Sequence, residues 1–212
     1  MLIKITADNF NKVLKKAVDI LNKGGIVAYP TETFYGLGAR FDNENALKKL
    51  YELKKRHEEK PMPLIIGSKE MLSIIAVSVN DTAAALMDKF WPGPLTLLLR
   101  AKKNLSKYLT AKTGRVAVRI PGESIAFYLA KETGFPITAT SANISGTPPA
   151  EDAGTVIKYF GDKIEMIIDG GKTHGGLPST IIDVTTGDVK IVREGAISTS
   201  TLKKVLPGIV WK

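Results

Sequence analysis

Residues 10–29, with the sequence FNKVLKKAVDILNKGGIVAY, decide the fold class. Apolar side chains recur along the first part with the period of a helix, so that one face of this helix is apolar. Gly24 and Gly25 end the helix, and residues 26–29 form a short apolar run that is typical of a buried strand. The stretch therefore predicts a helix that leads directly into a buried strand, as in α/β proteins.

Helical and strand patterns continue to alternate along the rest of the chain. The expected helices are one capped by Asp42 or Asn43, a short one after Ser68, one from Asn80 to Trp91, and others at 123–133, about 151–160 and about 199–205. The expected strands span residues 2–6, 64–66, 95–100, 116–120, 137–140, 164–168, 180–185 and 189–193, and residues 31–40 are expected to form a loop. Thr186-Gly187-Asp188 predicts a hairpin between the last two strands. Helical crossovers together with one hairpin predict a mixed α/β sheet in a single domain that spans residues 1–212.

The composition excludes several classes of protein. The 212 residues contain no cysteine, which rules out disulfides, thiolate catalysis and Cys-ligated metals. No apolar run approaches the ~20 residues that span a bilayer, and the strand-like N-terminus lacks the pattern of a signal peptide. We therefore expect a cytoplasmic protein without a membrane partner. The formal net charge of +9 favours polyanions such as nucleic acids or nucleotides, although a lysine-rich surface also raises solubility.

Three familiar kinds of site are absent from the sequence. Gly170-Gly171-Lys172-Thr173 resembles the end of a P-loop, but Met166 stands where the first glycine of that motif is required. Gly36-Leu37-Gly38 lacks the third glycine of a dinucleotide-binding motif. His57 and His174 do not have the spacing of metal ligands, and we expect both to be exposed. The sequence therefore predicts no metal held by the protein itself.

Cations gather where one predicted helix ends. Lys54, Lys55 and Arg56 lie in its last turn or directly after it, and Lys60 lies in the loop that follows. Cations at this end of a helix are favourable to its dipole even without any function. A junction between a helix and a loop can also direct several cations toward one bound anion, and Lys54 with Arg56 favours this second interpretation.

A second pair of cations brackets a predicted strand. Arg115 and Arg119 flank Val116-Ala117-Val118, and the period of two puts both arginines on one face of the strand. Two guanidinium groups on one face are suited to a carboxylate or a phosphate. The alternative is a sheet edge that charged residues protect from pairing with another chain.

Hydroxyl and amide side chains stand at the ends of predicted strands. Thr31-Glu32-Thr33 follows one strand, Ser141 and Asn143 follow another, and Ser179 precedes a third. Because ligands of open α/β sheets bind outside strand ends, these groups are candidates for holding a polar, phosphate-bearing substrate. Ordinary turn chemistry is the alternative, since Thr, Ser, Asn and Gly are all common in turns.

Taken in order, these pieces resemble the YrdC/Sua5 family of L-threonylcarbamoyladenylate synthases, over about residues 9–198. The resemblance rests on residues 29–37 (YPTETFYGL), 54–56 (KKR), 60–61 (KP), 90–96 (FWPGPLT), 118–121 (VRIP), 141–143 (SAN), 179–183 (STIID) and 193–197 (REGAI). The chain looks like the short form of the family, without the additional C-terminal domain of longer members.

The resemblance implies a twisted mixed sheet with flanking helices and a basic concave face. It also implies a nucleotidyltransferase that converts L-threonine, bicarbonate and ATP, with Mg²⁺ accompanying the ATP, into threonylcarbamoyl-AMP and pyrophosphate. The product would feed the N6-threonylcarbamoylation of adenosine 37 in tRNAs that read ANN codons. The implied partners are therefore the three substrates, with tRNA or downstream transfer proteins after them.

The resemblance further implies roles for individual residues. The positions that match the catalytic signature of the family are Lys54, Arg56, Ser141 and Asn143. The positions expected around ATP are Arg56, Lys60, Arg115, Ser141 and Arg193, and those expected to hold threonine are Thr33, Arg119 and Ser179. Two positions depart from the family pattern: Lys55 stands where glycine is frequent, and Pro149 stands where serine is frequent. A phosphate contact from that serine side chain is therefore absent.

Two other functions stay open. The net charge favours a module that binds tRNA or double-stranded RNA without catalysis, although the sequence lacks the aromatic-rich strands of many RNA-binding domains. The second alternative is a related carbamoyl-transfer enzyme, because this domain also occurs within hydrogenase-maturation proteins. Those proteins carry extra domains that this sequence lacks.

Overall fold

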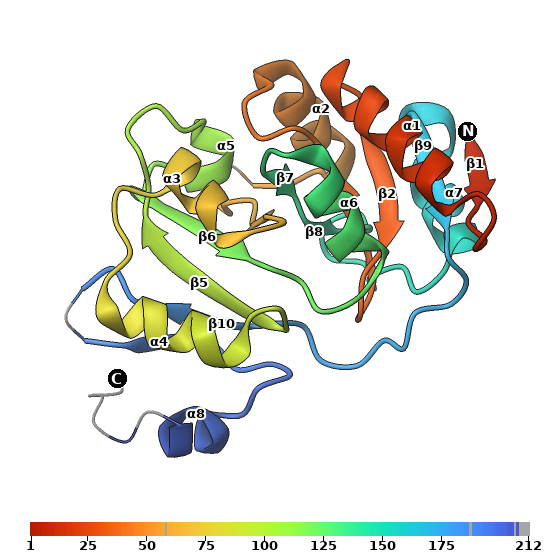
Figure 1. Cartoon of the computed structure of the whole chain (residues 1–212). Coiled ribbons are helices and arrows are strands. Elements are labelled where there is room, and N and C mark those ends of the chain that lie inside the picture. The colour runs from red at the N-terminus through yellow and green to blue at the C-terminus, as the bar shows by residue number, and fades with distance from the viewer. Residues whose placement is uncertain (58, 187, 206, 208–212) are drawn as a thin grey trace.

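The computed structural model describes residues 1–57, 59–186, 188–205 and 207, and its helices lie around two β-sheets (Figure 1). The helices are α1 (Phe10–Asn22), α2 (Glu44–Lys54), α3 (Leu72–Ile75), α4 (Asp81–Phe90), α5 (Lys107–Thr110), α6 (Ile125–Thr133), α7 (Ala153–Phe160) and α8 (Thr199–Val205), with 3₁₀ turns at Lys69–Met71 and Gly161–Lys163. Within the described ranges, no helix has both the length and the apolar character needed to cross a membrane.

The strands form a five-stranded and a six-stranded sheet rather than the single sheet expected from the sequence. The first sheet has the order β1-β9-β2-β3-β8 and the second has the order β11-β10-β5-β6-β4-β7. The strands are β1 (Leu2–Lys4), β2 (Val27–Pro30), β3 (Tyr35–Gly38), β4 (Leu64–Ile65), β5 (Leu95–Arg100), β6 (Arg115–Arg119), β7 (Ile137–Thr138), β8 (Thr140–Ser141), β9 (Met166–Asp169), β10 (Thr180–Asp183) and β11 (Lys190–Arg193). Both sheets contain parallel and antiparallel pairs, which confirms the mixed α/β class.

The opening stretch of the sequence folds as its pattern predicts. Val13, Leu14 and Leu21 on the apolar face of α1 are buried in one core with residues of α6 and β2. In Figure 1, α1 and α6 lie side by side over the first sheet. A larger core lies among α2, α4, α7 and strands of both sheets. The burial of these faces, more than helix propensity, fixes where the helices lie.

Local chemistry sets most helix ends. The side chains of Asn43, Asn80, Ser124 and Asp152 each accept a hydrogen bond from a backbone N–H in the first turn of the helix that follows. Gly134 ends α6 in the left-handed region, at φ +68°. Of the two candidate caps for α2, the structure selects Asn43.

The expectation of a loop over residues 31–40 is wrong in part. Residues Tyr35–Gly38 form β3, which pairs antiparallel with β2. The glycines that argue against regular structure have a packing reason, because a Cβ atom on Gly38 would lie 2.6 Å from the Tyr29 ring. The tight contact between Tyr29 and this strand therefore requires the glycine.

The strand expected at residues 137–140 is divided between the two sheets. Residues Ile137–Thr138 form β7, which pairs with β4, whereas Thr140–Ser141 form β8, which pairs with β3. The chain thus crosses from the second sheet to the first within a few residues. Figure 1 shows β7 and β8 where the two sheets meet. This crossing places Ser141 at the end of the first sheet, shortly after the chain leaves the second.

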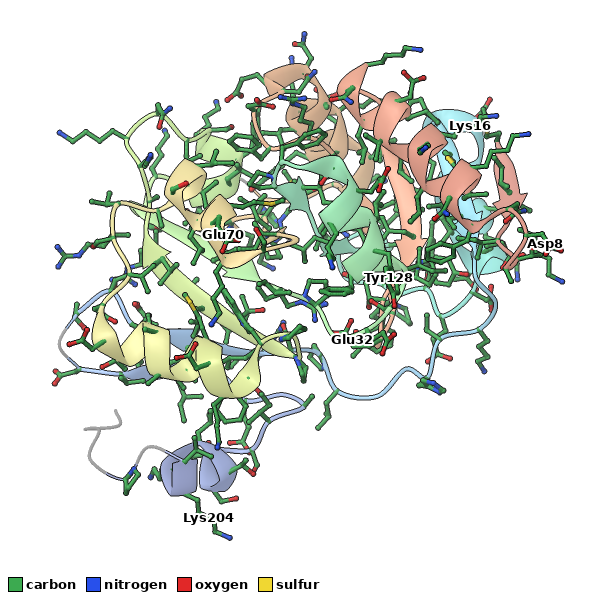
Figure 2. All side chains as sticks on the ribbon, viewed as in Figure 1. Asp8, Lys16, Glu32, Glu70, Tyr128 and Lys204 are labelled. Atoms are coloured by element: carbon green, nitrogen blue, oxygen red, sulfur yellow. The ribbon has the colours of Figure 1, made fainter. Side chains whose placement is uncertain are left out.

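Two further differences concern short elements. The four-residue helix α5 was not expected, because so short a segment shows no periodicity. The hairpin between the last two strands is confirmed by the antiparallel pairing of β10 with β11, although Gly187 of the expected turn lies outside the described residues. Figure 2 shows Lys204 projecting outward from α8, and Glu32 near the turn that joins β2 to β3.

Candidate functional site

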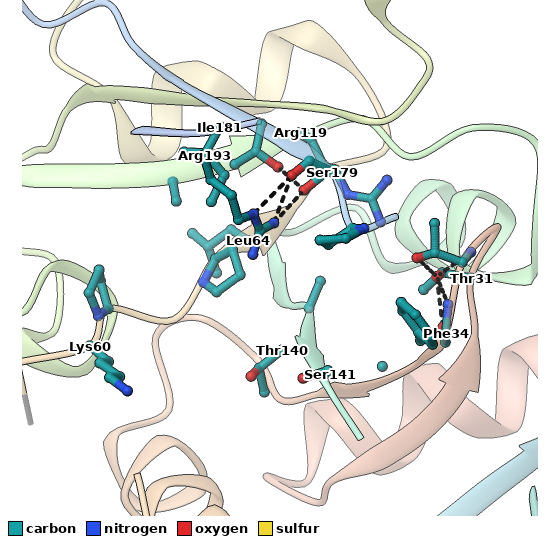
Figure 3. A pocket seen from close by; sticks show the side chains of 18 of the residues that line it. Thr31, Phe34, Lys60, Leu64, Arg119, Thr140, Ser141, Ser179, Ile181 and Arg193 are labelled. Atoms are coloured by element: carbon teal, nitrogen blue, oxygen red, sulfur yellow. Dashed lines mark hydrogen bonds between the residues drawn. The ribbon is translucent and has the colours of Figure 1, made fainter. Parts of the chain in front are cut away.

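A cavity of about 620 Å³ lies between the two sheets. Its walls come from the segment that joins β2 to β3, from β5, β6 and β11, and from the loop after α2. Seven of the ten predicted site residues line it: Thr33, Arg56, Lys60, Arg119, Ser141, Ser179 and Arg193. Figure 3 shows Arg119, Ser179 and Arg193 close together, with Lys60 and Thr31 on opposite sides of the cavity.

The loop after α2 is wrapped around the side chain of Arg56. The Nε atom of Arg56 donates to the Lys60 carbonyl at 2.8 Å, and Nη2 donates to the Pro61 carbonyl at 2.7 Å. The Tyr51 hydroxyl donates to the same Lys60 carbonyl at 2.5 Å. Burial lowers the pKa of Arg56 from its usual value, but a guanidinium stays charged at neutral pH. This loop therefore presents a fixed cation, and the Lys60 chain beside it, to the cavity.

Lys54 does not line the cavity, although the resemblance counted it among the catalytic residues. Its side chain is buried, and Nζ donates to the Ser141 carbonyl and, at 2.7 Å and 3.2 Å, to the carbonyl and the side-chain oxygen of Asn143. The Lys54 carbonyl in turn accepts from the Ser145 N–H at 2.8 Å. The end of α2 is thus joined to residues 141–145, and the ammonium group of Lys54 is directed at these residues rather than at the cavity.

Asn143 also lies behind the cavity wall rather than in it. Its side-chain oxygen accepts a hydrogen bond from the Ser141 hydroxyl at 2.5 Å, and its Nδ2 donates to the Thr147 carbonyl at 2.7 Å. Asn143 is buried, whereas Ser141 is half-buried and lines the cavity. The lysine and the asparagine of the signature therefore fix the place of its serine.

Four side chains, those of Thr96, Arg119, Ser179 and Arg193, meet near the ends of β5, β6, β10 and β11. Arg193 donates to the Ser179 carbonyl from Nη2 at 2.7 Å and from Nε at 3.2 Å, and Nη2 lies 3.3 Å from the Ser179 hydroxyl. The Ser179 hydroxyl also pairs with the Thr96 hydroxyl at 2.9 Å. Burial, and then the charge of Arg119, lower the pKa of Arg193. Two guanidinium groups therefore share this part of the cavity with two hydroxyls.

The turn after β2 uses its two threonines differently. The Thr31 hydroxyl donates to the Phe34 carbonyl at 2.7 Å and accepts from the Thr33 N–H at 3.1 Å, which is ordinary turn chemistry. The Thr33 hydroxyl lies 3.2 Å from the Thr31 hydroxyl in the cavity wall. Thr31 therefore shapes the turn, and Thr33 is the better placed of the two to contact a ligand.

Arg115 differs from Arg119 in its surroundings. Its guanidinium forms an ion pair with Asp183 at 2.8 Å and does not line the cavity. Val116 and Val118 are buried on the opposite face, as the period of two predicts. The interpretation of this strand as a charged sheet edge is wrong, because β6 pairs with β5 on one side and with β4 on the other.

The sequence did not indicate two residues of this region as site residues. Thr96 lines the cavity, and its only signal is one hydroxyl in the otherwise apolar run of residues 95–99. Glu32 forms an ion pair with Arg119, and sequence alone does not reveal a partner that lies 87 positions away. Pro149, where the family often has serine, lines the cavity and offers no side-chain donor.

The chemistry of the walls favours an anionic ligand with a polar end. Guanidinium groups, an ammonium group and hydroxyls are donors for phosphate and carboxylate oxygens. Among the described residues, no group of three or more His, Cys, Asp or Glu side chains is placed to hold a metal ion, and both His57 and His174 are exposed. The arrangement can bind and orient an anion and neutralise its charge.

Comparison with known proteins extends these observations. The family model Sua5/YciO/YrdC, described as telomere recombination, matches residues 19–195. The threonylcarbamoyl-AMP synthase of Pyrococcus abyssi is 40% identical over 193 residues, which cover 91% of this chain and 57% of the relative. The threonylcarbamoyl-AMP synthase of Bacillus subtilis is 37% identical over 194 residues, which cover 91% of this chain and 56% of the relative. The chain thus spans a little over half the length of these curated relatives.

A solved structure has a very similar fold. The crystal structure of P. abyssi Sua5 complexed with L-threonine superposes with a TM-score of 0.91 at 37% sequence identity. The match covers 100% of this chain and 62% of that chain.

Proposed function

Because the chain belongs to the Sua5/YciO/YrdC family, we propose that it makes L-threonylcarbamoyl-AMP and pyrophosphate from L-threonine, bicarbonate and ATP. One observation carries the proposal: a single cavity brings together seven of the residues to which the family resemblance gives roles toward ATP and threonine. Residues as distant in sequence as Thr33 and Arg193 line it together. The reaction would class the protein as a nucleotidyltransferase.

The ATP half of the proposed site lies around Arg56, Lys60, Ser141 and Arg193. Arg56 is held by backbone carbonyls and Ser141 by Asn143, so both can meet a phosphate without first being ordered. Guanidinium and ammonium groups neutralise the charge that develops on the departing pyrophosphate. Arg115 lies outside the cavity wall, so any contribution to ATP binding would be weaker and longer in range.

The amino-acid half of the proposed site consists of Thr33, Arg119 and Ser179. Arg119 is the candidate for the threonine carboxylate, since guanidinium and carboxylate match in charge and geometry. Thr33 and Ser179 are candidates for the threonine hydroxyl and amine. With threonine held here, its amine condenses with bicarbonate to form the carbamate and release water, and one carbamate oxygen then attacks the α-phosphate of ATP and displaces pyrophosphate.

This chemistry needs no protein nucleophile. Orientation of the reacting groups supplies up to roughly 7–11 kcal/mol of the barrier, and the cations stabilise the transferred charge. Mg²⁺ is expected to enter as the partner of the triphosphate, which would supply most of its ligands. The carboxylates that the structure describes include no cluster that would hold it separately.

We propose in addition that the product is consumed in the threonylcarbamoylation of adenosine in tRNA. The adenylate is a mixed anhydride, which transfers its carbamoyl group readily to an amine. Transfer would be carried out by downstream proteins or on bound tRNA, in the cytoplasm. The net charge of +9 is compatible with a tRNA contact.

The decisive experiment measures release of pyrophosphate from ATP with bicarbonate present, with and without L-threonine. We expect release only with threonine, and absence of that dependence would overturn the proposal. Carbamoyl phosphate in place of threonine and bicarbonate distinguishes the related carbamoyl-transfer reaction. RNA binding without any ATP turnover would instead favour the RNA-binding module.

Two variants test the position of the site. Arg56→Ala and Ser141→Ala should each lower turnover while the protein stays folded at the assay temperature, as circular dichroism would show. Lys48→Met, at an exposed position of α2 outside the cavity wall, serves as the control. Full activity in both site variants would show that the reaction takes place elsewhere.

A further inference from the structure

The carboxylate of Glu32 is paired with the guanidinium of Arg119 at the edge of the cavity. The ion pair joins Nη1 of Arg119 to Oε1 of Glu32. The two side chains are only 10% and 21% exposed, so solvent screens their charges weakly. Arg119 itself lines the cavity, whereas Glu32 lies beside it. Figure 2 shows Glu32 near the turn that joins β2 to β3.

Only one of the two carboxylate oxygens of Glu32 takes part in this ion pair. Its second oxygen, Oε2, is enclosed and has no hydrogen-bond partner among the residues that the structure describes. Tyr29, which interacts electrostatically with both charges of the pair, is a buried phenol whose hydroxyl donates to the Thr138 carbonyl at 2.7 Å. Burial raises the pKa of Tyr29, so this phenol stays neutral and supplies no charge. The local field is therefore set by Glu32 and the two neighbouring arginines.

This arrangement changes what Arg119 can bind. An unpaired guanidinium attracts any carboxylate, but a guanidinium that is already paired presents little net charge to a second one. A ligand with only a carboxylate would gain binding free energy from its attraction to Arg119 and lose part of it through repulsion from Glu32. A ligand that also carries an ammonium group regains that loss through attraction to Glu32. A neutral zwitterion is the ligand class that fits a neutral ion pair.

We propose that Glu32 makes the Arg119 end of the cavity select a zwitterionic α-amino acid over a plain carboxylate. The inference rests on the proposed function, since it concerns how the same site chooses its amino acid. Glu32 acts through Arg119 and through its charge, and is a specificity-determining residue rather than a catalytic one. Arg193, nearby, has no carboxylate partner among the ion pairs of the described residues and stays available for phosphate.

The test compares two ligands that differ only in the ammonium group. L-Threonine and (R)-3-hydroxybutanoate share the carboxylate, the hydroxyl and the carbon chain. Their affinities are measured by titration calorimetry on the wild type and on Glu32→Gln, which keeps the shape of the side chain and removes its charge. We expect the wild type to prefer threonine, and Glu32→Gln to lower this preference by about tenfold or more.

Asp42→Asn is the matched control. Asp42 pairs with Arg40 at 2.7 Å, outside the cavity wall, so this variant removes one carboxylate charge from an arginine pair elsewhere. It should leave both affinities unchanged. Glu32→Asp, which keeps the charge, should retain a preference for threonine.

Several results would overturn the inference. If Glu32→Gln weakens both ligands equally, Glu32 only orients Arg119 and does not select by charge. If the wild type binds both ligands with equal affinity, the inference fails whether or not any variant folds. If the wild type binds no threonine at all, the proposed function fails as well, and this separates the two failures.

Discussion

Replacement of Lys54 by methionine is the sharpest test of the link between α2 and residues 141–145. The side chain is 1% exposed, and its ammonium group donates to three oxygens of Ser141 and Asn143. Methionine has a similar length and volume and no donor. Lys54→Met therefore removes the hydrogen bonds while it leaves the packing largely filled.

The cost of this change depends on which oxygens keep another partner. The Ser141 carbonyl still accepts from the Asn143 N–H at 3.0 Å, and the Asn143 side-chain oxygen still accepts from the Ser141 hydroxyl at 2.5 Å. The Asn143 carbonyl loses the one donor that the structure describes for it. A buried carbonyl left unpaired costs about 1–3 kcal/mol, and relief from burying an ammonium offsets part of the other losses. We expect the free energy of unfolding to fall by about 2 kcal/mol at pH 7.

The pH dependence has a definite sign. Burial, and then the charge of Arg56, lower the pKa of Lys54 from 10.5 to about 7. Between these values the unfolded chain holds a proton that the folded protein has released, so the stability of the wild type rises with pH, by at most about 1.4 kcal/mol per unit. Lys54→Met lacks this gain. The stability difference between the two proteins should therefore be constant below pH 7 and grow above it.

Urea unfolding followed by circular dichroism, at about pH 6, 7 and 9, measures this difference. Lys48→Met on the same helix is the control, because its exposed ion pair with Glu52 at 3.9 Å contributes little. The same samples give the turnover of ATP, which should fall because Ser141 and Asn143 lose the side-chain hydrogen bonds that join them to α2. A stability difference that shrinks between pH 7 and 9, or full activity at every pH, would refute the reasoning.

Two further predictions concern neighbouring residues. Lys55 caps α2 in the left-handed region, with φ +49°. Lys55→Gly should raise the free energy of unfolding by about 0.5–1 kcal/mol, because the left-handed strain of lysine exceeds the entropy that glycine adds to the unfolded chain. A lower thermal midpoint of unfolding for Lys55→Gly would contradict this. Arg115→Ala should raise the KM for ATP less than Arg56→Ala does, since Arg115 is paired with Asp183 outside the cavity wall. Equal increases of this KM in steady-state kinetics would show that Arg115 contacts the nucleotide.

The sequence by itself determined most of the local elements and named seven residues that line the cavity. The period of α1, the caps Asn43 and Asn80, and the glycine after α6 are encoded within a few residues, since helix ends depend on nearby donors and acceptors. The motifs around Thr33, Arg119 and Ser179 also named residues that do line the cavity. Such motifs can be identified from the sequence because each is a short, contiguous segment.

Only the tertiary structure decided how these pieces face one another. The division of residues 137–141 between two sheets, the burial of Lys54 against Asn143 and the pairing of Glu32 with Arg119 all join segments far apart in the chain. Hydrophobic periodicity and secondary-structure propensity describe one segment at a time, whereas an ion pair between distant residues forms only when two segments pack together. The lysine of the signature therefore looked like a ligand-binding cation in the sequence, and packing made it a support for the serine that faces the cavity.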